Sequence, residues 1–155
     1  MEDIKTIKEL YDLWVLLAMT RDAIYRATKE ELSKYGVTPI RSAVMLHIDS
    51  LGSKATPPEI GRYLLRKRNS ISDLLSRMEQ AELVKRSQAS PTKKSKRYEL
   101  TAKGRELYHK TIQLKTVEHV FSSLSPEQRQ QLQSLLRVVF EKALEELDIK
   151  IMYPC

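Results

Sequence analysis

The sequence predicts a mainly α-helical fold with one small β-hairpin, an α+β chain that forms a single compact unit. Only 4 Gly and 6 Pro occur among 155 residues, too few for a fold built from many strands and tight turns. Apolar residues recur at helical spacing toward both ends of the chain, and strand-like alternation is confined to a short central stretch. A chain of this length suits one hydrophobic core rather than two independent domains.

The first third of the chain predicts two helices. Residues 4–35 contain neither Pro nor Gly, and their apolar side chains recur every three, four or seven positions, which indicates one long amphipathic helix. Gly36 follows as a stop signal. Thr38 and the proline after it then form the N-cap and first turn of a helix over residues 39–51, which Gly52 ends.

Two shorter helices are predicted next. Thr56, two prolines and a glutamate match a capping box and open a helix over residues 57–65. Asn69 and Ser70 are cap-forming residues, so the following helix is predicted over residues 70–81. Its apolar side chains share one face, and its opposite face carries hydrogen-bonding side chains.

A β-hairpin follows these helices. Residues 83–87 and 97–100 have the composition and alternation of short strands. The segment between them, QASPTKKSK, is expected to form a long basic tip.

The C-terminal third predicts two further helices. Thr101 caps a helix over residues 102–121, whose Gly104 lies in the first turn, where the helix-propensity cost of glycine is tolerable. Ser125 and the residues after it repeat the cap, proline and capping-box pattern and open a last helix with a long apolar stripe.

Positive charge is concentrated in the middle of the chain. Residues 59–105 contain 13 Lys and Arg against 5 Asp and Glu, whereas the rest of the chain contains 14 against 15. This asymmetry is typical of a polyanion-binding module on a neutral scaffold, and a solvated basic face is the simpler alternative.

The order of helix, turn, helix and basic hairpin is that of a winged helix-turn-helix. A helix fits the major groove of B-DNA, and a hairpin beside it can reach the backbone or the minor groove. We therefore expect the helix over residues 70–81 to read bases, while cations of the preceding turn and of the hairpin neutralise phosphates. The predicted DNA-binding residues are Arg66, Lys67, Arg68, Asn69, Ser70, Ser72, Asp73, Ser76, Arg77, Lys93, Lys94, Lys96 and Arg97.

This ordered set of motifs resembles the MarR family of bacterial and archaeal transcription regulators. The resemblance rests on EIGRYLLRKRNSISDLLSRMEQAELVKRS and KSKRYELTAKGRELY, with GVTPIRSAVMLHI before them and LSPEQRQQLQSLLRVVFEKALEEL after them, so it covers nearly the whole chain. It implies a winged-helix homodimer, and regulators of this kind frequently bind phenolic or other aromatic ligands that lower DNA affinity.

Two positions depart from the pattern of that family. Members commonly carry an Asp-x-Arg motif in the wing, whose aspartate braces the arginine, and the matching positions here are Thr92, Lys93 and Lys94. We therefore expect the wing tip to be held in another way or to become ordered only on DNA. Members also often have Gly at the position that Glu82 occupies here.

The first and last helices carry more apolar surface than a small winged-helix core can bury. We expect residues 1–35 and 102–150 to form a helical dimerisation region beside a DNA-binding domain of residues 38–101. A two-fold homodimer would bind a palindrome with half-sites about 34 to 36 Å apart, and packing within one chain is the alternative. The predicted dimerisation residues are Ile4, Ile7, Leu132, Leu136, Val139, Phe140, Ala143 and Leu147.

Three aromatic residues of the first helix allow two interpretations. Tyr11, Trp14 and Tyr25 either belong to a core or line a ligand pocket between the dimerisation region and the DNA-binding domain. The histidines lack metal-ligand spacing, and the single cysteine, Cys155, lies at the end of the chain without an evident partner. We therefore expect no metal site and no cofactor.

These observations favour a sequence-specific regulator that binds double-stranded DNA, and a repressor is the simplest kind, because a protein on its operator blocks polymerase without an activation surface. A nonspecific or architectural DNA-binding protein of the same fold is the alternative. The sequence has no phosphate-binding loop, nucleophile elbow or matched acid and base that would favour an enzyme. It also lacks an apolar stretch of the roughly 20 residues that a membrane span requires, so we expect a cytoplasmic protein.

Overall fold

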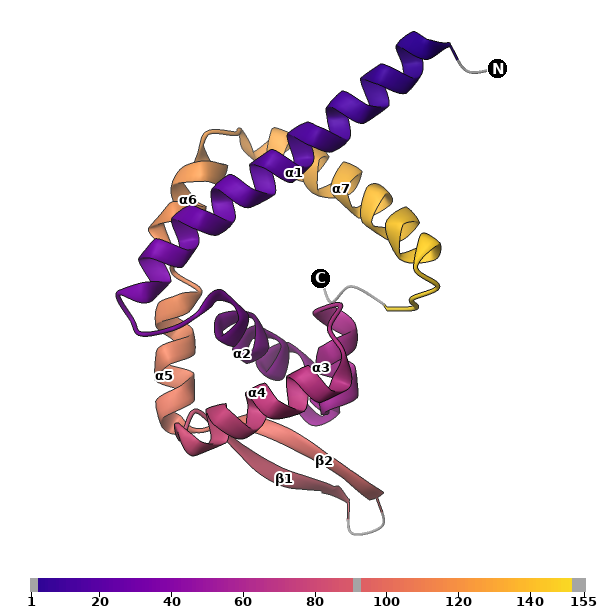
Figure 1. Cartoon of the computed structure of the whole chain (residues 1–155). Coiled ribbons are helices and arrows are strands. Elements are labelled where there is room, and N and C mark those ends of the chain that lie inside the picture. The colour runs from indigo at the N-terminus through magenta and orange to yellow at the C-terminus, as the bar shows by residue number, and fades with distance from the viewer. Residues whose placement is uncertain (1–2, 91–92, 152–155) are drawn as a thin grey trace.

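A computed structural model describes residues 3–90 and 93–151 of the chain. Over these residues it confirms a mainly helical fold with one antiparallel hairpin (Figure 1). None of the helices in this described part is long and apolar enough to span a bilayer. The elements in chain order are α1 (Ile4–Ser33), α2 (Pro39–Leu51), the short 3-10 helix η1 (Gly52–Lys54), α3 (Pro57–Tyr63), α4 (Arg68–Gln80), β1 (Val84–Ser90), β2 (Lys93–Leu100), α5 (Ala102–Thr111), α6 (Lys115–Ser122) and α7 (Pro126–Glu146).

The molecule has two parts. Figure 1 shows α2, α3, α4 and the hairpin gathered together, with α5 along their side, and we call residues 37–111 the head. On the other side α1, α6 and α7 form what we call the helical layer. The chain passes from the layer to the head between α1 and α2, and it returns between α5 and α6.

The hydrophobic core lies in the head. Apolar side chains from α2, α3, α4, α5 and both strands pack into one cluster, in which Met45, Ile60, Leu75 and Met78 are fully buried. Burying one side chain of this size contributes about 1.5–3 kcal/mol. Among the described residues, α1, α6 and α7 contribute nothing to this cluster, so the head has a core of its own.

Four helices begin where their cap residues predict. The hydroxyls of Thr38, Thr56, Thr101 and Ser125 accept hydrogen bonds from backbone N–H groups in the first turns of α2, α3, α5 and α7. Gln128 completes the last capping box, because its side chain accepts a hydrogen bond from the Ser125 N–H at 2.8 Å.

The turn between α3 and α4 lies two residues earlier than predicted. Leu65 adopts a left-handed conformation with a φ of 52°, and the Arg66 N–H donates to the Gly61 carbonyl at 2.8 Å. The chain therefore reverses before residue 66, and Lys67 becomes the N-cap position of α4 without a side-chain hydrogen bond. The predicted cap at Ser70 is wrong, because that residue already lies inside the helix.

The hairpin is longer than predicted. Its strands pair from Val84 with Leu100 out to Ser90 with Lys93, with an irregular register after Gln88. Most of the predicted basic tip is therefore strand. A polar, basic segment shows no apolar alternation, yet backbone hydrogen bonds alone can extend a hairpin through it.

The single helix predicted over residues 102–121 is in fact two helices, α5 and α6, separated by residues 112–114. The residue before α6 provides no side-chain cap. Instead, the Glu31 carboxylate of α1 accepts hydrogen bonds from the N–H groups of Lys115 and Thr116. This long-range cap starts a new helix at a place where the local sequence contains no start signal.

Gly104 is required by packing and is not merely tolerated. A Cβ atom at this position would overlap the carbonyl oxygen of Leu83. That carbonyl is held in place, because it accepts a hydrogen bond from the Thr101 N–H at 3.1 Å, while the Leu83 N–H donates to the Met78 carbonyl at 2.9 Å. The first turn of α5 therefore approaches the start of β1 at backbone distance.

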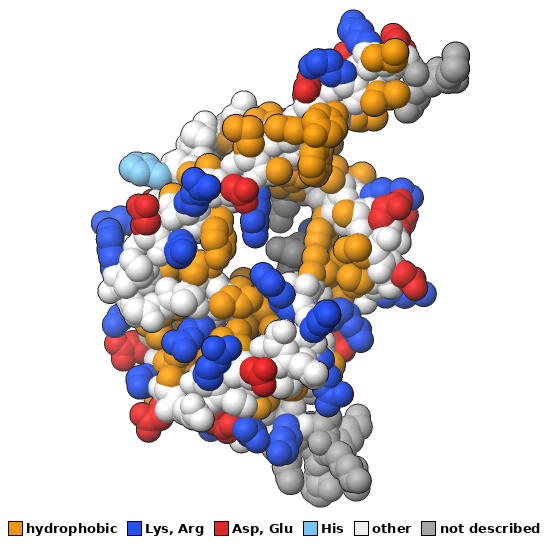
Figure 2. All heavy atoms as spheres, in the orientation of Figure 1, with side chains coloured by type: hydrophobic (Ala, Val, Ile, Leu, Met, Phe, Trp, Pro, Cys, Tyr) orange, Lys and Arg blue, Asp and Glu red, His pale blue; other side chains and the backbone are white. Residues whose placement is uncertain are grey.

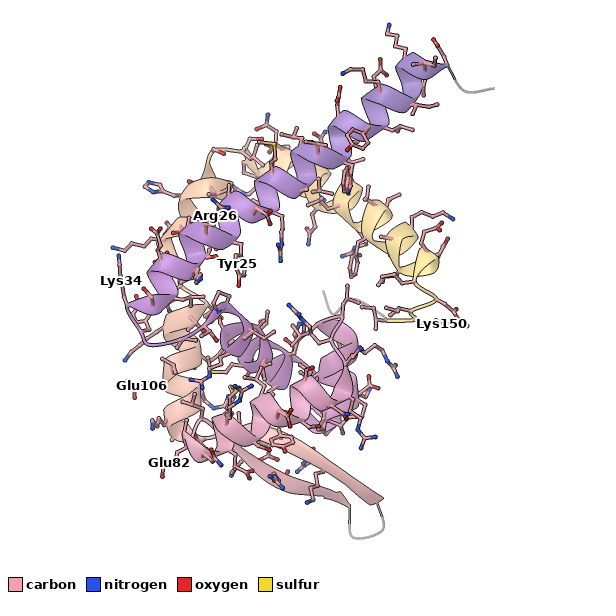
Figure 3. All side chains as sticks on the ribbon, viewed as in Figure 1. Tyr25, Arg26, Lys34, Glu82, Glu106 and Lys150 are labelled. Carbon is pink, nitrogen blue, oxygen red and sulfur yellow. The ribbon has the colours of Figure 1, made fainter. Side chains whose placement is uncertain are left out.

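Glu82 occupies the turn between α4 and β1 in a left-handed conformation, with a φ of 59°. Its side chain points away from the fold (Figure 3) and is 81% exposed. Within the described residues its carboxylate has one ion pair, to Lys103 at 3.8 Å. The backbone at this position favours Gly, and the Glu side chain compensates little for the strain.

Replacing Gly104 by Ala should destabilise the protein by about 1–3 kcal/mol, the usual cost of overpacking, even though Ala is the better helix former. Urea denaturation followed by circular dichroism measures the change. Lys110→Ala, on the exposed side of the same helix, is the control and should change stability by less than about 0.5 kcal/mol. A Gly104→Ala protein as stable as the wild type would contradict the close approach to Leu83.

Replacing Glu82 by Gly should stabilise the protein by about 0.5–1 kcal/mol, because it relieves the left-handed strain at a small cost in chain entropy. A thermal melt should show a rise in Tm of about 1–4 °C. Glu82→Ala removes the same side chain and keeps the Cβ atom, so it should bring no such rise. Equal Tm values for the two variants would argue against backbone strain at this turn.

Candidate nucleic-acid interface

The outward face of α4 is polar and accessible. Four apolar residues, Ile71, Leu74, Leu75 and Met78, are buried against the rest of the head. Because a helix buries one stripe, the residues between them must face outward. The predicted base-reading side chains lie on this outward side, where Asn69, Ser70, Asp73 and Arg77 are exposed and Ser72 and Ser76 are half-buried.

Three cations surround the beginning of α4. Arg66, Lys67 and Arg68 are all exposed, and none of them pairs with a carboxylate in the described part of the chain. The N-terminal end of a helix carries partial positive charge, so cations placed there are unfavourable on their own. The same arrangement favours an anion such as a phosphate.

The other cations of the head are mostly neutralised within it. Arg62 pairs with Glu59, the glutamate of the predicted capping box, at 3.2 Å, and Arg86 pairs with Glu79 at 2.7 Å. Lys85, Lys103 and Arg105 likewise have carboxylate partners. Among the described side chains of residues 59–105, the cations without a carboxylate partner are Arg66, Lys67, Arg68, Arg77 and Lys96, all on α4, on the turn before it or on the hairpin.

The hairpin contains an acidic brace that the sequence did not predict. The Arg97 Nε donates to the Ser87 hydroxyl at 2.6 Å, and a terminal nitrogen of its guanidinium pairs with Glu99 at 3.0 Å. The Ser87 hydroxyl also donates to Glu99 at 3.0 Å. Arg97 and Glu99 are two residues apart on β2, and Ser87 pairs with Arg97 in register, so strand pairing was the signal that could have revealed the network.

The structure therefore distinguishes between the DNA-binding residues that were predicted for the wing. The side chain of Lys96 is exposed, whereas Arg97 is held within the hairpin. Lys93 and Lys94 lie on β2, and their side chains are outside the described part, as is the whole of Thr92. A role for any of them in DNA binding stays a prediction.

The helical layer leaves large apolar side chains uncovered. Ile4 is 83% exposed and Leu147 is 59% exposed, and Figure 2 shows apolar side chains gathered on α1 and α7. Monomers rarely expose contiguous apolar surface of this kind, so packing within one chain does not account for these residues. Of the remaining predicted dimerisation residues, Ile7, Leu136, Val139 and Ala143 are exposed, and Leu132 and Phe140 are half-buried.

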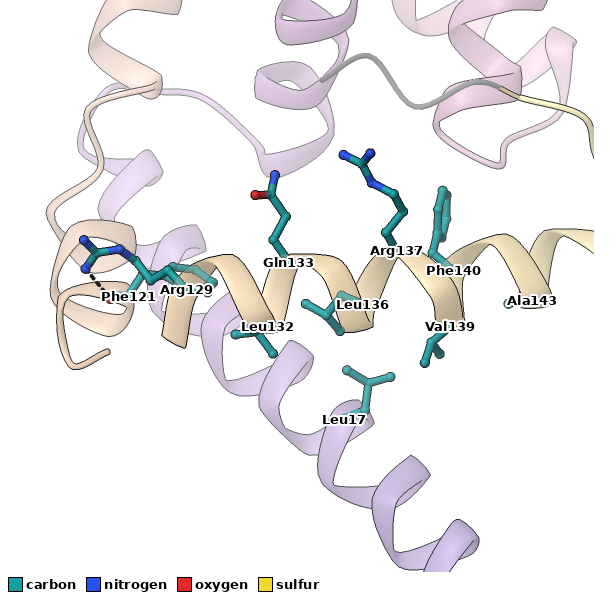
Figure 4. A pocket seen from close by; sticks show the side chains of 10 residues that line it. All are labelled: Leu17, Phe121, Arg129, Leu132, Gln133, Leu136, Arg137, Val139, Phe140 and Ala143. Atoms are coloured by element: carbon teal, nitrogen blue, oxygen red, sulfur yellow. Dashed lines mark hydrogen bonds between the residues drawn. The ribbon is translucent and has the colours of Figure 1, made fainter. Parts of the chain in front are cut away.

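A cavity of about 720 Å³ lies along α7 in the helical layer (Figure 4). Leu17 of α1 points toward α7 from one side, while Gln133 and Arg137 point to the other side. Arg129 donates hydrogen bonds to the carbonyls of Phe121 in α6 and of Leu124 just after it. The lining residues are Leu17, Phe121, Arg129, Leu132, Gln133, Leu136, Arg137, Val139, Phe140 and Ala143.

The three aromatic residues predicted for a ligand pocket do not line this cavity. The rings of Tyr11 and Trp14 pack against each other with their centres 5.3 Å apart, and both side chains are more than half exposed. The Arg21 guanidinium carbon lies 5.2 Å from the centre of the Tyr25 ring, and the Tyr25 side chain points from α1 toward the head (Figure 3). Their role in ligand binding remains a prediction.

The titratable and potentially metal-binding residues outside this interface include His47 and Cys155. The His47 ring stacks on Tyr63 at 5.4 Å, and burial lowers the pKa of His47 below its ordinary value. No three His, Cys, Asp or Glu side chains come together as a metal site among the residues that the structure describes. Cys155 lies outside those residues.

This chain resembles known proteins both in sequence, over part of its length, and in structure, over most of it. Residues 35–94, from just before the head into β2, match the MarR family model. None of the curated protein sequences gives a significant match.

Solved structures share the fold over most of the chain. The organohalide-sensing transcriptional regulator RdhR-CbdbA1625 in its 2,4-dichlorophenol-bound form has a TM-score of 0.80 at 21% identity, covering 100% of this chain and 94% of that chain. A mutant MarR from E. coli complexed with operator DNA has a TM-score of 0.72 at 23% identity, covering 89% and 99%. The MepR–DNA complex of S. aureus has a TM-score of 0.71 at 20% identity, covering 83% and 96%.

The family model covers the helix-turn-helix and most of the wing, and the structural likeness extends through α1, α6 and α7. Residues 35–94 therefore match the MarR family, and the chain as a whole shares the fold of these winged-helix regulators.

Proposed function

We propose that this protein is a homodimeric repressor that binds a palindromic double-stranded DNA operator and is released from it by an aromatic small molecule. The observation that carries the proposal is the distribution of charge in the head. Within residues 59–105 six described cations pair with a carboxylate, and the five that do not lie in the turn before α4, on α4 or on the hairpin. We place the protein in the cytoplasm of a bacterium or archaeon.

In the proposed complex α4 enters the major groove. The side chains of Asn69, Ser76 and Arg77 are of the types that form hydrogen bonds with base edges. Arg66 and Lys67 neutralise phosphates beside the groove, and Lys96 reaches the backbone from the hairpin. The phosphate contacts set affinity and salt dependence, and the contacts of α4 set sequence preference.

The dimer is built from the helical layer. The uncovered apolar faces of α1 and α7 supply surface that a second copy of the chain buries. A two-fold axis then presents two copies of α4 to half-sites about 34 to 36 Å apart. The MarR and MepR relatives were solved on DNA, which supports the same use of the head here.

Release by a ligand is supported by the cavity along α7. Its volume of about 720 Å³ is in the range of small-molecule sites, and most of its lining is apolar. RdhR-CbdbA1625 was solved with 2,4-dichlorophenol bound, which supports an aromatic compound as the ligand class. A ligand that binds better to a layer geometry unsuited to the operator would lower DNA affinity by that difference.

A nonspecific, architectural DNA-binding protein is the alternative function. It is favoured by the three cations before α4, which would contact phosphates of any sequence. The hydrogen-bonding face of α4 argues for sequence preference instead.

Fluorescence anisotropy with the upstream region of the protein's own gene and with a scrambled duplex separates the two functions. For a repressor that acts at its own gene, we expect specific binding about a thousandfold or more tighter than random binding at the same salt concentration. Equal, steeply salt-dependent binding to many different duplexes would favour the architectural alternative. Absence of binding to any duplex would contradict both.

Replacing Arg66 and Lys67 by Ala should weaken binding to every duplex and reduce the slope of log K against log salt by about 0.9 for each phosphate that is no longer neutralised. Titrations at several salt concentrations measure that slope. Lys110→Ala is a matched control, because Lys110 pairs with Glu106 on α5 at 2.9 Å. An unchanged slope in the double variant would remove these two residues from the interface.

A further inference from the structure

The head and the helical layer are joined by two short segments. Residues 34–38 connect α1 to α2, and residues 112–114 connect α5 to α6. Figure 1 shows the end of α1 next to the junction of α5 and α6, so the two connections pass the same point of the molecule. The orientation of the head relative to the layer depends on what holds this point.

Glu31 ties the two connections together. It lies in the last turn of α1, and one carboxylate oxygen accepts a hydrogen bond from the Lys115 N–H at 2.8 Å. The other oxygen accepts one from the Thr116 N–H at 2.9 Å. These donors are 84 and 85 positions further along the chain. The Glu31 carboxylate thereby links the end of α1, just before residues 34–38, to the start of α6, just after residues 112–114.

The first turn of α6 depends on this carboxylate. Leu114 occupies its N-cap position and has no side-chain hydrogen bond to offer. By contrast, α2, α3, α5 and α7 are capped by the hydroxyl of the residue just before them. An acidic group at a helix N-terminus is also favoured by the helix dipole. Loss of Glu31 would therefore free the start of α6 and loosen residues 112–114.

On one side of this break α5 belongs to the head. Tyr108 and Leu107 pack in or against the head core, which also contains the buried face of α4. On the other side α6 packs along α1. The break between α5 and α6 is therefore the hinge between the surface that is proposed to contact DNA and the layer that is proposed to dimerise.

We infer that Glu31 is a positioning residue for DNA recognition, which fixes the angle between head and helical layer and with it the half-site spacing that the dimer accepts. The inference rests on the proposed function. Each base pair added between half-sites moves the second one by about 3.4 Å and rotates it by about 34°, so a dimer with fixed heads discriminates strongly among spacings. With loosened heads, only a fraction of the dimers has the correct geometry at any moment.

The hydrogen bonds from Lys115 and Thr116 to the charged Glu31 carboxylate are expected to persist at neutral pH. Hydrogen bonds from Thr116, first of all from its backbone N–H, lower the pKa of the Glu31 carboxyl below its ordinary value. A carboxyl with a lowered pKa contributes to stability above its unfolded-state pKa and loses that contribution as the pH falls through the lowered value. Experiments near pH 7 therefore examine the charged, hydrogen-bonded state.

The test compares Glu31→Gln with Glu30→Gln in the full-length protein. Both variants remove one negative charge from the same turn of α1, and the Glu30 side chain makes no hydrogen bond within the described residues. Hydrogen exchange measured by mass spectrometry should show faster exchange over residues 112–118 in Glu31→Gln and wild-type exchange in Glu30→Gln. Unchanged exchange in Glu31→Gln would overturn the inference.

The second measurement is affinity for operators whose half-sites are moved by −1, +1 or +2 base pairs. Wild type and Glu30→Gln should lose about tenfold for a shift of one base pair, the order of one mismatched base pair. Glu31→Gln should bind the unshifted operator more weakly than wild type does, and a shift of one base pair should lower its affinity by less than about threefold. Equal spacing discrimination in all three proteins would overturn the role in positioning, even if exchange is faster.

A purely structural defect is separated by a further variant. Glu31→Ala removes both acceptor oxygens without adding an amide, and it must produce the same two changes while retaining a cooperative thermal transition. Loss of affinity for all spacings in equal proportion would mean that Glu31 supports stability alone, and would overturn the inference. If wild type binds no DNA specifically, the proposed function and the spacing role both fail, while the exchange result still decides whether Glu31 holds the hinge.

Discussion

The burial of one face of α4 is the interaction on which the rest of the structure depends. Ile71, Leu74, Leu75 and Met78 pack into the head core, so the geometry of the helix sends its remaining side chains outward. The same packing fixes α4 against α3 and the hairpin. The hydrogen-bonding face and the cations beside it are thus presented by a rigid element, which is what recognition of a fixed groove requires.

The two parts of the molecule present different surfaces. Within residues 59–105 the described cations without a carboxylate partner lie in the turn before α4, on α4 or on the hairpin, whereas most of the large uncovered apolar side chains lie on the helical layer. An interface that buries unpaired cations carries a desolvation penalty, so the apolar faces of α1 and α7 are better suited to a protein interface than the surface around α4 is.

The two departures from the family pattern have local consequences. At Glu82 the backbone adopts the left-handed conformation that suits Gly, so the Glu side chain is accommodated without a right-handed turn. In the wing, the network of Ser87, Arg97 and Glu99 places an acid near the base of the hairpin, whereas the family motif has its aspartate further out. Arg97 is thereby held in the hairpin, and Lys96 beside it remains exposed.

The sequence by itself determined the helix starts at Thr38, Thr56, Thr101 and Ser125 and the polar face of α4, because caps and helical periodicity act over a few neighbouring residues. Only the tertiary structure decided the break between α5 and α6, since its cap comes from Glu31 on another helix. It likewise decided the pairing of cations and the lining of the cavity. Those features depend on distances between elements that are remote in the chain, and no local pattern encodes such distances.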